Sequence, residues 1–407
     1  MTTGPGGRRL HAPAPVVFLW AAQFCSQFGD SIFQIAFIWL ILDLTGSKAA
    51  TGGAATISYL PSLLFGMGAG LAIDRWNRLR ILISSDAIRA TLLAAAGLLH
   101  FTGHLGAATL TAIAFGVATS AVFFYPGRDS LLPELVPADR LVGVNAWVQL
   151  SQQMAFFVGP LVAGVLIQRY GVGSAFPAGA ALFAGSLLLL LGMGGAGSRH
   201  ASGRRPLGLV EDFRSGLRAI GRDRSLVLLL ALTGLDNLFI MGPAIIGNAV
   251  LVRETLRGDA STYALVEATY GIGMIAGSLA LARWGARFRP SRVLLWGILL
   301  DGLTYVPLYW CRTLPGVLAV SLIHSLVIPI ITVPRATLLQ RMLPPALLGR
   351  VFALVNILVV GMTAISSGLT GLALEWITAP QLFGAIGLLA ASTGALGLCS
   401  RRLRRLS

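Results

Sequence analysis

Charged side chains are scarce in this sequence. Only 12% of its 407 residues are charged, against about 25% in soluble domains, while 55% are hydrophobic and the mean hydropathy is +0.78. A chain of this composition cannot cover its surface with water-facing side chains, which excludes an ordinary soluble protein. Apolar runs of the ~20 residues that a helix needs to cross a bilayer recur along the whole chain. We therefore expect an all-α polytopic membrane protein.

Cysteine and lysine are also rare. The three cysteines, Cys25, Cys311 and Cys399, lie far apart and show neither metal-site spacing nor a disulfide framework. The single lysine, Lys48, lies outside any Gly-x4-Gly-Lys-Ser/Thr pattern, so ATP hydrolysis by a phosphate-binding loop is excluded. The net charge of +15 comes from arginines in short loops, so we expect no nucleic-acid binding. We also expect no cofactor and no metal, because His100 and His104 have helical spacing but no third ligand nearby.

Twelve apolar spans are predicted, in two sets of six. Their ranges are 15–42, 50–73, 81–101, 106–127, 141–168 and 173–195, then 225–250, 261–283, 291–311, 315–335, 347–375 and 379–399. This gives an N-terminal segment 1–14, a first bundle 15–195, a polar linker 196–224, a second bundle 225–399 and a basic tail 400–407. In the linker, apolar residues recur every three or four positions, which predicts an amphipathic helix on the bilayer surface; they are Leu209, Phe213, Leu217 and Ile220.

Basic residues predict the orientation of the chain. With both termini on one side of the membrane, 25 of the 31 basic residues fall on that side and five on the other, with Arg89 inside a span. The positive-inside rule then places both termini in the cytoplasm. We expect a bacterial cytoplasmic (inner) membrane protein. The first apolar run is too long and too polar for a signal peptide, so we expect it to be retained.

The two halves of the chain resemble each other. Segment 125–137 aligns with 333–345 at an offset of 208, and the same offset places Arg75-Trp76 on Arg283-Trp284. A nearby offset places segment 30–33 on 236–239. Because a six-span offset keeps orientation, these are parallel repeats about an axis along the membrane normal. The predicted fold is two pseudo-symmetric six-helix bundles facing a central cleft, as rocking alternating access requires.

Polar side chains within the spans are candidates for a transport pathway, because a charge at the bilayer centre costs ~2.5–3.5 kcal/mol. In the first span one helical stripe carries Gln23, Gln27, Asp30 and Gln34. We predict Asp30 as a substrate or proton site; the alternative is a structural hydrogen bond between helices. The repeat mates of Asp30 and its neighbour are Asp236 and Asn237.

Further candidates lie in the later spans: Glu267, Asp301 and His324. A lone histidine such as His324 is more often a packing residue than a proton carrier. Asp86 and Arg89, one turn apart, are predicted to form an ion pair within their helix. Arg89 is placed near the cytoplasmic end of its span.

A charged turn follows the second span, in the sequence Gly70-x-x-x-Asp74-Arg75-x-x-Arg78-x-Arg80. It resembles the loop 2–3 motif of the major facilitator superfamily, with Asn77 where that pattern usually has Gly. The segment with Gly159, Pro160 and Gly164 resembles the antiporter motif of drug exporters. Segments 124–137, 338–340 and 349–351 are similar to the twelve-span branch of macrolide efflux proteins and the enterobactin exporter.

This resemblance implies roles for both motifs. Asp74 would pair with cytoplasmic arginines and helix ends to latch the outward-open state, and only the first half has this acid, since Ala282 stands at the repeat position. Gly159, Pro160 and Gly164 would bend the fifth span and pack at the central interface.

These observations predict a proton-coupled secondary transporter that exports a small amphipathic compound, such as an antibiotic, a siderophore or another secondary metabolite. The alternatives are uptake of a lipid or small nutrient and, further off, a non-transporting membrane sensor or scaffold. We expect no enzyme, because no His, Asp and Glu cluster assembles a catalytic site. The expected partners are the substrate and the lipid bilayer, and the expected state is a monomer.

Overall fold

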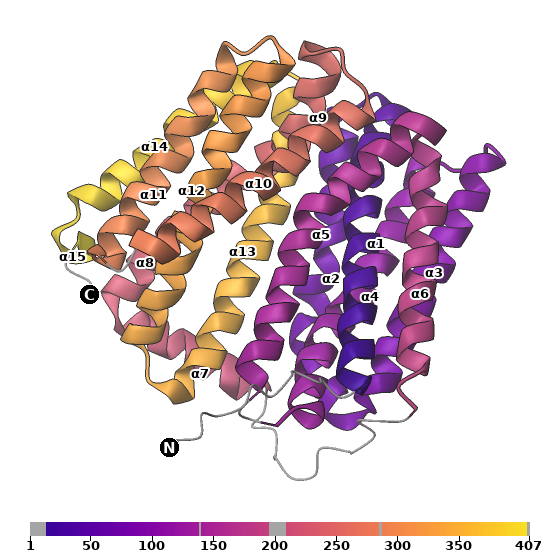
Figure 1. Ribbon diagram of the computed structural model, residues 1–407. Coiled ribbons are helices and arrows are strands. Elements are labelled where there is room, and N and C mark those ends of the chain that lie inside the picture. The colour runs from indigo at the N-terminus through magenta and orange to yellow at the C-terminus, as the bar shows by residue number, and fades with distance from the viewer. Residues whose placement is uncertain (1–13, 138–139, 195–208, 285–286, 405–407) are drawn as a thin grey trace, which may run out of the picture.

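The computed structural model describes residues 14–137, 140–194, 209–284 and 287–404, and in these ranges the chain is helical, with no strand. The first bundle comes from six long helices (Figure 1): α1 (Ala14–Thr45), α2 (Lys48–Arg75), α3 (Arg78–Phe101), α4 (Ala107–Leu135), α5 (Leu141–Tyr170) and α6 (Ala175–Leu191), with η1 (Val172–Ser174) before α6. After α7 (Leu209–Arg222), the second bundle holds α8 (Arg224–Gly242), α9 (Asn248–Val250), α10 (Ala260–Trp284), α11 (Pro290–Tyr305), α12 (Leu314–Met342), α13 (Pro345–Leu374), α14 (Ala379–Cys399) and α15 (Arg401–Arg404). The predicted all-α fold is confirmed.

Eleven helical segments within the described residues are long and apolar enough to cross a membrane. The remaining predicted span, 50–73, lies within the 28-residue helix α2. α4 and α12 end at Leu135 and Met342, well beyond the predicted ends at 127 and 335, although each contains two prolines. Membrane helices tolerate such prolines because neighbouring groups satisfy the freed carbonyls.

The seventh span is one helix from Arg224 to Thr255 in which α-helical and π-helical winding alternate. Its second half contains two π-helical turns, η2 (Pro243–Gly247) and η3 (Leu251–Thr255), on either side of α9. π-helical turns are rare and occur frequently at functional sites. Asn248 lies between the two π-helical turns, and Arg253 and Glu254 lie within the second. All three residues take part in contacts described below.

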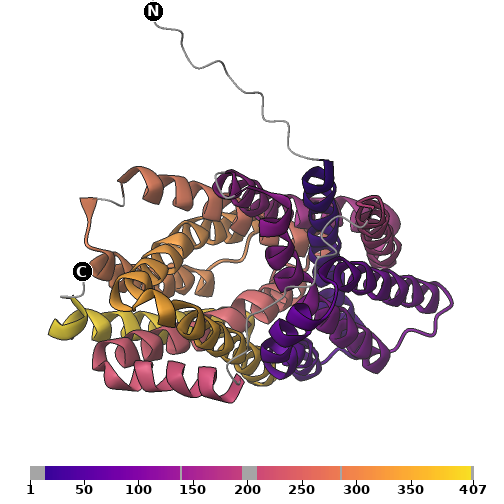
Figure 2. The same ribbon diagram turned by 90° about the horizontal axis from the view of Figure 1, so that it is seen from below.

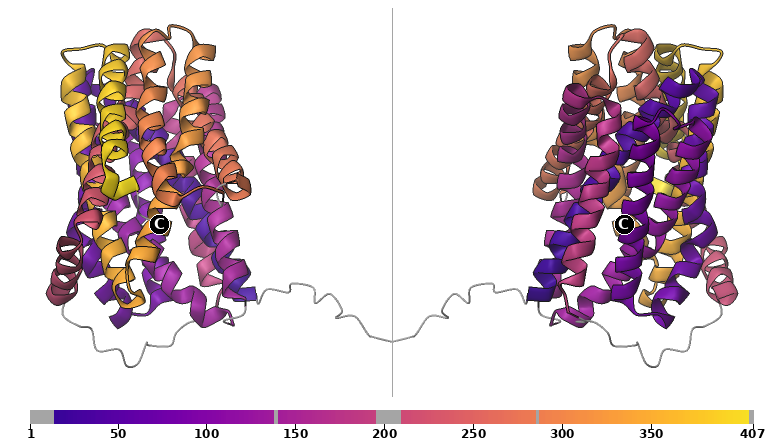
Figure 3. Two further views of the ribbon diagram at one scale, coloured as in Figure 1. Left: turned by 90° about the vertical axis from the view of Figure 1, so that its left-hand side faces the viewer. Right: turned by 90° about the vertical axis from the view of Figure 1, so that its right-hand side faces the viewer.

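The buried apolar side chains form three cores. One core includes residues of both bundles, such as Ile32–Leu42 of α1 and Ala260–Tyr270 of α10. The other two cores each belong to one bundle, toward the end of the molecule where α7 and the start of α1 lie (Figures 1 and 3). We call this end the linker side and the opposite end the far side. The bundles therefore share a core on the far side and have separate cores on the linker side.

Close backbone contacts on the far side join the bundles. A Cβ placed on Gly52 of α2 would lie 2.9 Å from the Cα of Gly371 of α13, so only glycine fits there. A Cβ on Gly66, Gly68 or Gly70, nearer the linker side of α2, meets no described atom within 4 Å. The structure is thus closed on the far side and open on the linker side.

The linker helix α7 packs against the second bundle. A Cβ on its Gly216 would lie 2.7 Å from Leu354 Cδ1 of α13, and Arg350 Nη1 donates to Ser215 Oγ at 3.0 Å. Ile220 joins the core of the second bundle, whereas Leu217 is 48% exposed. In the side views and from below, α7 lies along the outer edge of the molecule (Figures 2 and 3). The predicted amphipathic helix is present; the side chain of Leu209 lies outside the described part.

Candidate functional site

A polar band lies between the far-side core and the two linker-side cores. On α1 the apolar cores include residues 16–22 and 32–42, and Gln23, Gln27 and Asp30 of the polar stripe fall between them. The same break occurs on α3 at Asp86 and Arg89 and on α11 at Asp301, whose carboxylate lies 3.7 Å from His324 of α12. Sequence-distant polar groups of both bundles therefore share one depth in the membrane.

The first-bundle part of this band is centred on Arg89. Its fully buried guanidinium donates from Nη1 to Asp30 Oδ2 at 3.0 Å and from Nη2 to Asp86. The rings of Phe124 and Phe183 lie 4.5 and 4.6 Å from the guanidinium carbon, which adds cation–π attraction. Arg89 is thus held by two carboxylates and two aromatic faces.

The two carboxylates differ in their surroundings. Asp86 is fully buried and accepts hydrogen bonds from Ser26 Oγ at 3.2 Å and from the Ser186 hydroxyl. Asp30 accepts a hydrogen bond from the Tyr125 hydroxyl at 2.5 Å, and 26% of its side chain is exposed. Asp30 is therefore the carboxylate of this network that solvent or a substrate can reach.

The rest of the α1 stripe continues this network toward the linker side. Gln23 accepts from Arg128 Nη1 at 2.7 Å and from Gln27 at 3.0 Å, and it donates to Ser151 of α5. Gln34, on the far side of Asp30, bonds to the hydroxyl of Tyr59. The stripe therefore connects α1 to α2, α4 and α5 instead of facing only an open pathway.

Sequence reasoning missed part of this network. The ion pair between Asp86 and Arg89 was predicted, but the expected place of Arg89 near a helix end is wrong, because α3 runs from Arg78 to Phe101 and Arg89 lies near its middle. Arg128 was counted as a loop residue, because the fourth span was expected to end at 127, whereas α4 continues to Leu135. An arginine within a long apolar helix was the available signal for Arg89.

The second bundle holds a separate hydrogen-bonded cluster. Asn248 Nδ2 lies 3.1 Å from both Glu267 Oε1 and the Tyr270 hydroxyl, and this hydroxyl lies 3.2 Å from that of Tyr305. The Tyr305 ring stacks on His324, with ring centroids 3.9 Å apart. Glu267 and His324, which were predicted separately, therefore belong to one buried cluster.

The other predicted residues of this bundle surround His324 and α8. Asp301 Oδ1 lies 3.7 Å from His324 Nδ1, which is hydrogen-bonded to Thr304 at 2.9 Å. Asp236 interacts electrostatically with Arg335 of α12 and with Asp301. Its neighbour Asn237 bonds to a carbonyl of its own helix at 2.9 Å. The repeat mates of the first span are therefore arranged differently from Asp30.

Unpartnered polar atoms gather in this second cluster. Eight buried side-chain atoms of the described residues have no hydrogen-bond partner. Five of them are here: Asp236 Oδ1, Asn248 Oδ1, Asp301 Oδ1, Ser321 Oγ and His324 Nε2. Because unpaired buried polar groups are costly, these atoms are places for water, protons or polar groups of a ligand.

The motif after the second span sits at the linker side. Arg78 pairs with Glu134 of α4 and donates to the Ser130 carbonyl at 3.1 Å, so it bonds within its own bundle. Arg75 and Arg80 are exposed, and Gly70 has open space beside it. The side chain of Asp74 lies outside the described part.

The interface motif divides between two contacts. A Cβ on Gly159 would lie 2.3 Å from Ser31 Oγ of α1, within the first bundle, and Pro160 beside it is buried. A Cβ on Gly164 would lie 3.2 Å from Ala264 Cβ of α10 in the second bundle. α5 thus uses this motif to contact both α1 and the partner bundle.

A set of polar contacts that was not predicted joins the bundles on the far side. Lys48 Nζ lies 2.9 Å from Glu254 Oε1, and Arg253 lies 3.2 Å from Asp43. Glu375 accepts hydrogen bonds at 2.9 Å from the Ala49 amide and the Ser47 hydroxyl. We call these three contacts the far-side clasp. Because each connects one bundle with the other, the clasp stabilises the closed far side.

Comparison with known proteins identifies the family of this chain. A family model described as a transmembrane secretion effector matches residues 13–404. The chain belongs to this family, within the major facilitator superfamily. Macrolide efflux protein A of Streptococcus pyogenes is 24% identical over 347 residues, which cover 83% of each chain. The multidrug efflux pump Tap of Mycobacterium tuberculosis is 30% identical over 214 residues, or 51% of each chain.

A solved structure shows the same fold. The nucleoside transporter NupG superposes with a TM-score of 0.80 over 97% of this chain and 100% of that one, at 12% sequence identity. The predicted resemblance to major facilitator proteins and to macrolide efflux proteins is confirmed. This major facilitator protein is therefore a multi-pass secondary transporter.

Proposed function

We propose that this transporter exports a small amphipathic compound from the cytoplasm in exchange for protons. The relatives named for macrolide and multidrug efflux support export of an amphipathic, antibiotic-like solute. The linker side then faces the cytoplasm, in accordance with the excess of arginines in its loops. The conformation described above would be the state that takes up substrate.

The observation that carries this proposal is the polar band between the cores. It places a partly exposed carboxylate, Asp30, beside a buried arginine at the depth where the shared far-side core gives way to two separate ones. A carboxylate at this depth can exchange protons or attract a cationic group of the solute from either side as the bundles rock. The clasp and the close glycine contacts would have to break for that motion.

Proton coupling places a specific requirement on Asp30. Protonation of its carboxyl group weakens the ion pair with Arg89, while Arg89 keeps Asp86 as a counter-ion. A transmembrane potential contributes about 2.3 kcal/mol per charge per 100 mV, and a pH gradient adds to it. Each proton that enters from outside can therefore drive outward movement of a solute.

The test is transport of radiolabelled erythromycin in proteoliposomes with an imposed pH gradient. We expect Asp30→Asn to lose gradient-driven transport but to retain exchange of labelled for unlabelled erythromycin. Asp259→Asn is the matched control, because Asp259 is a carboxylate in a far-side turn that bonds only to nearby residues, such as Thr262.

The outcomes separate the parts of the proposal. Unchanged gradient-driven transport in Asp30→Asn would remove Asp30 from the proton path. Transport that runs with the proton gradient instead of against it would favour uptake. A protein that moves neither erythromycin nor other amphipathic solutes in either direction would contradict the transport function itself.

A further inference from the structure

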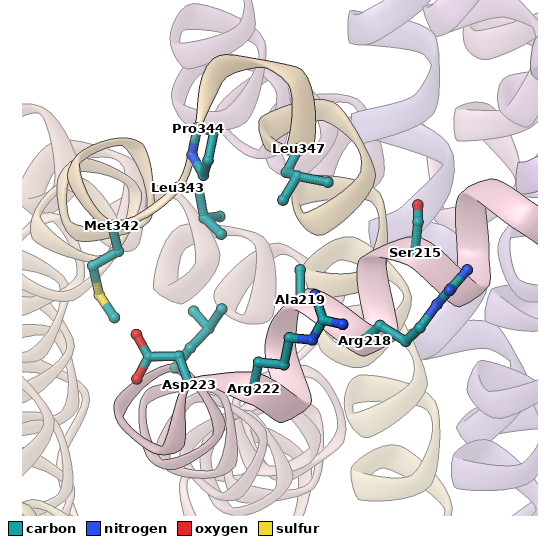
Figure 4. A pocket seen from close by; sticks show the side chains of 10 residues that line it. Ser215, Arg218, Ala219, Arg222, Asp223, Met342, Leu343, Pro344 and Leu347 are labelled. Atoms are coloured by element: carbon teal, nitrogen blue, oxygen red, sulfur yellow. The ribbon is translucent and has the colours of Figure 1, made fainter.

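A cavity lies on the linker side, apart from the polar band. It has a volume of about 430 Å³ and is enclosed by α7, the start of α8 and the turn between α12 and α13 (Figure 4). Its lining combines arginines of α7 with leucines of the second bundle. This combination suits a ligand that is anionic at one end and apolar at the other.

The polar wall of this cavity is basic but not uniformly so. The Arg222 guanidinium points toward the middle of the cavity and forms no ion pair with any described residue (Figure 4). Arg218 pairs with Glu211, and both side chains are 58% exposed, so this pair contributes little and can exchange partners. Asp223, the next residue along the chain after Arg222, uses one oxygen to cap α8 by accepting from the Ser225 amide at 2.8 Å. Its other oxygen is left to accept from a hydroxyl group.

The apolar wall lies beside the membrane. Leu226, Leu343 and Leu347 line the cavity, and Leu226 and Leu343 belong to the linker-side core of the second bundle. α7 runs along the outer edge of the molecule (Figure 2), and the neighbouring Val227 is 41% exposed on the apolar helix α8. The cavity therefore lies where phospholipid head groups meet the ends of membrane helices.

We propose that this cavity binds one anionic glycerophospholipid. Its phosphate would lie against Arg222 and Arg218, its head-group hydroxyls near Asp223, and the upper part of an acyl chain along the leucines. Basic pockets beside membrane helices on the cytoplasmic side are suited to such head groups. A free phosphate would leave the apolar wall uncovered. The proposal does not depend on the transport function.

A bound lipid would have a structural consequence. In the sequence, α7 connects the first bundle to the second. In space, it contacts the second bundle through Gly216 and Ser215. A lipid that contacts both α7 and the α12–α13 turn would bind the docked helix in preference to a detached one, and it would stabilise that arrangement by mass action.

The test uses the purified full-length protein, delipidated in detergent and titrated with phosphatidylglycerol by native mass spectrometry. We expect Arg222→Gln to weaken binding about fivefold, as for one arginine near an anionic surface. Arg214→Gln removes the same charge from an exposed position of the same helix that does not line the cavity, and it should leave binding unchanged. Equal losses in the two variants would show diffuse attraction to a basic helix and would overturn the proposal.

A second variant tests the cavity itself. Ala219→Phe fills part of the cavity and keeps every charge, so it should also weaken phosphatidylglycerol binding. Wild-type binding by this variant would overturn the site. Inorganic phosphate at millimolar concentration should not displace the lipid; displacement would identify an ion site instead. Phosphatidylglycerol should raise the thermal unfolding midpoint of the wild type and Arg214→Gln equally, and that of Arg222→Gln by less.

Discussion

Removal of the positive charge of Lys48 should shift the transporter toward far-side opening. Lys48 is the single lysine of the chain, and it contacts Glu254 across the two bundles at 2.9 Å. Beside this pair, Arg253 contacts Asp43 at 3.2 Å. Arg253 and Glu254 are consecutive in a π-helical turn, so one turn of the second bundle presents both charges to the first bundle.

The expected size of the shift follows from exposure. The side chains are 18% and 44% exposed in the first pair and 33% and 55% exposed in the second. Pairs of this kind contribute about 0.2–1 kcal/mol, and about 1 kcal/mol changes an equilibrium roughly fivefold. Lys48→Gln should therefore raise the ratio of far-side-open to far-side-closed protein by about 1.4- to fivefold. Loss of both pairs should have a larger effect, although neighbouring pairs need not be additive.

Spin labels at Thr102 and Thr313 would measure this ratio by pulsed electron–electron distance measurements. These exposed residues lie in far-side turns, one in each bundle. The native cysteines must first be replaced by alanine, and they are Cys25, Cys311 and Cys399. Arg312→Gln is the control, because among the described residues Arg312 bonds to carbonyls of its own bundle alone, at 2.8 and 3.0 Å.

A double-mutant cycle decides whether the pair itself is responsible. Lys48→Gln, Glu254→Gln and the double variant should all shift the distance distribution by a similar amount, because each removes the same contact. Independent, additive shifts in the two single variants would refute the clasp. So would a shift of the same size in Arg312→Gln.

Three further predictions concern the clasp, the glycine contact and the charge network. Hydrogen bonds, the largest from the Ala49 amide, hold the pKa of Glu375 below its ordinary 4.5, so its contact is present at neutral pH and is lost only as pH falls through the lowered pKa. Far-side distances should thus stay constant from about pH 7 to 5 and lengthen below the ordinary pKa. Gly371→Leu would overpack the α2–α13 contact, at about 1–3 kcal/mol, and open the far side in the same assay. Arg89→Gln leaves Asp86 buried without its cation and should cost about 3–5 kcal/mol, measured by thermal unfolding.

Each of these predictions has a matched control. Glu375→Gln keeps an acceptor oxygen but should lose the acid response. Gly66→Leu adds the same side chain to α2 where a Cβ meets no described atom within 4 Å, so it should leave the far side closed. The double variant Asp86→Asn/Arg89→Gln should be more stable than Arg89→Gln alone; equal stabilities would contradict the role of the ion pair.

The sequence predicted elements well where one physical effect dominates. Apolar run length located the helices, because a bilayer-spanning helix needs a minimum length of apolar residues whatever its neighbours. Helical spacing placed Gln23, Gln27, Asp30 and Gln34 on one stripe, since this depends on a single helix. Helix ends were less predictable: α4 and α12 pass through prolines that usually stop a helix in water.

Contacts between helices could not be predicted in the same way. The sequence predicted the pair of Arg89 with Asp86, one helical turn away. It did not predict the contact of Arg89 with Asp30, because these two residues are 59 positions apart in the sequence and lie on different helices. From the sequence, Lys48 was assigned to a loop on the far side of the membrane and no partner was predicted for it. Its contact with Glu254 depends on how the two bundles pack against each other. Asn248 was not predicted as a site residue, because a single amide in an apolar helix has no neighbouring sequence pattern that indicates its role. Its two hydrogen bonds with Glu267 and Tyr270 arise only from packing.

The internal repeat produced two bundles of the same fold with different electrostatics. In the first, two carboxylates share the buried Arg89, and Asp30 is the one that solvent reaches. If Asp30 had been the only counter-ion, its protonation would leave a buried arginine unpaired, at a cost of several kcal/mol. With Asp86 held by Ser26 and Ser186, that cost is avoided and the network stays paired in both protonation states. In the proposed exchange of solute for protons, the second carboxylate therefore allows Asp30 to take up and release a proton while Arg89 keeps a counter-ion.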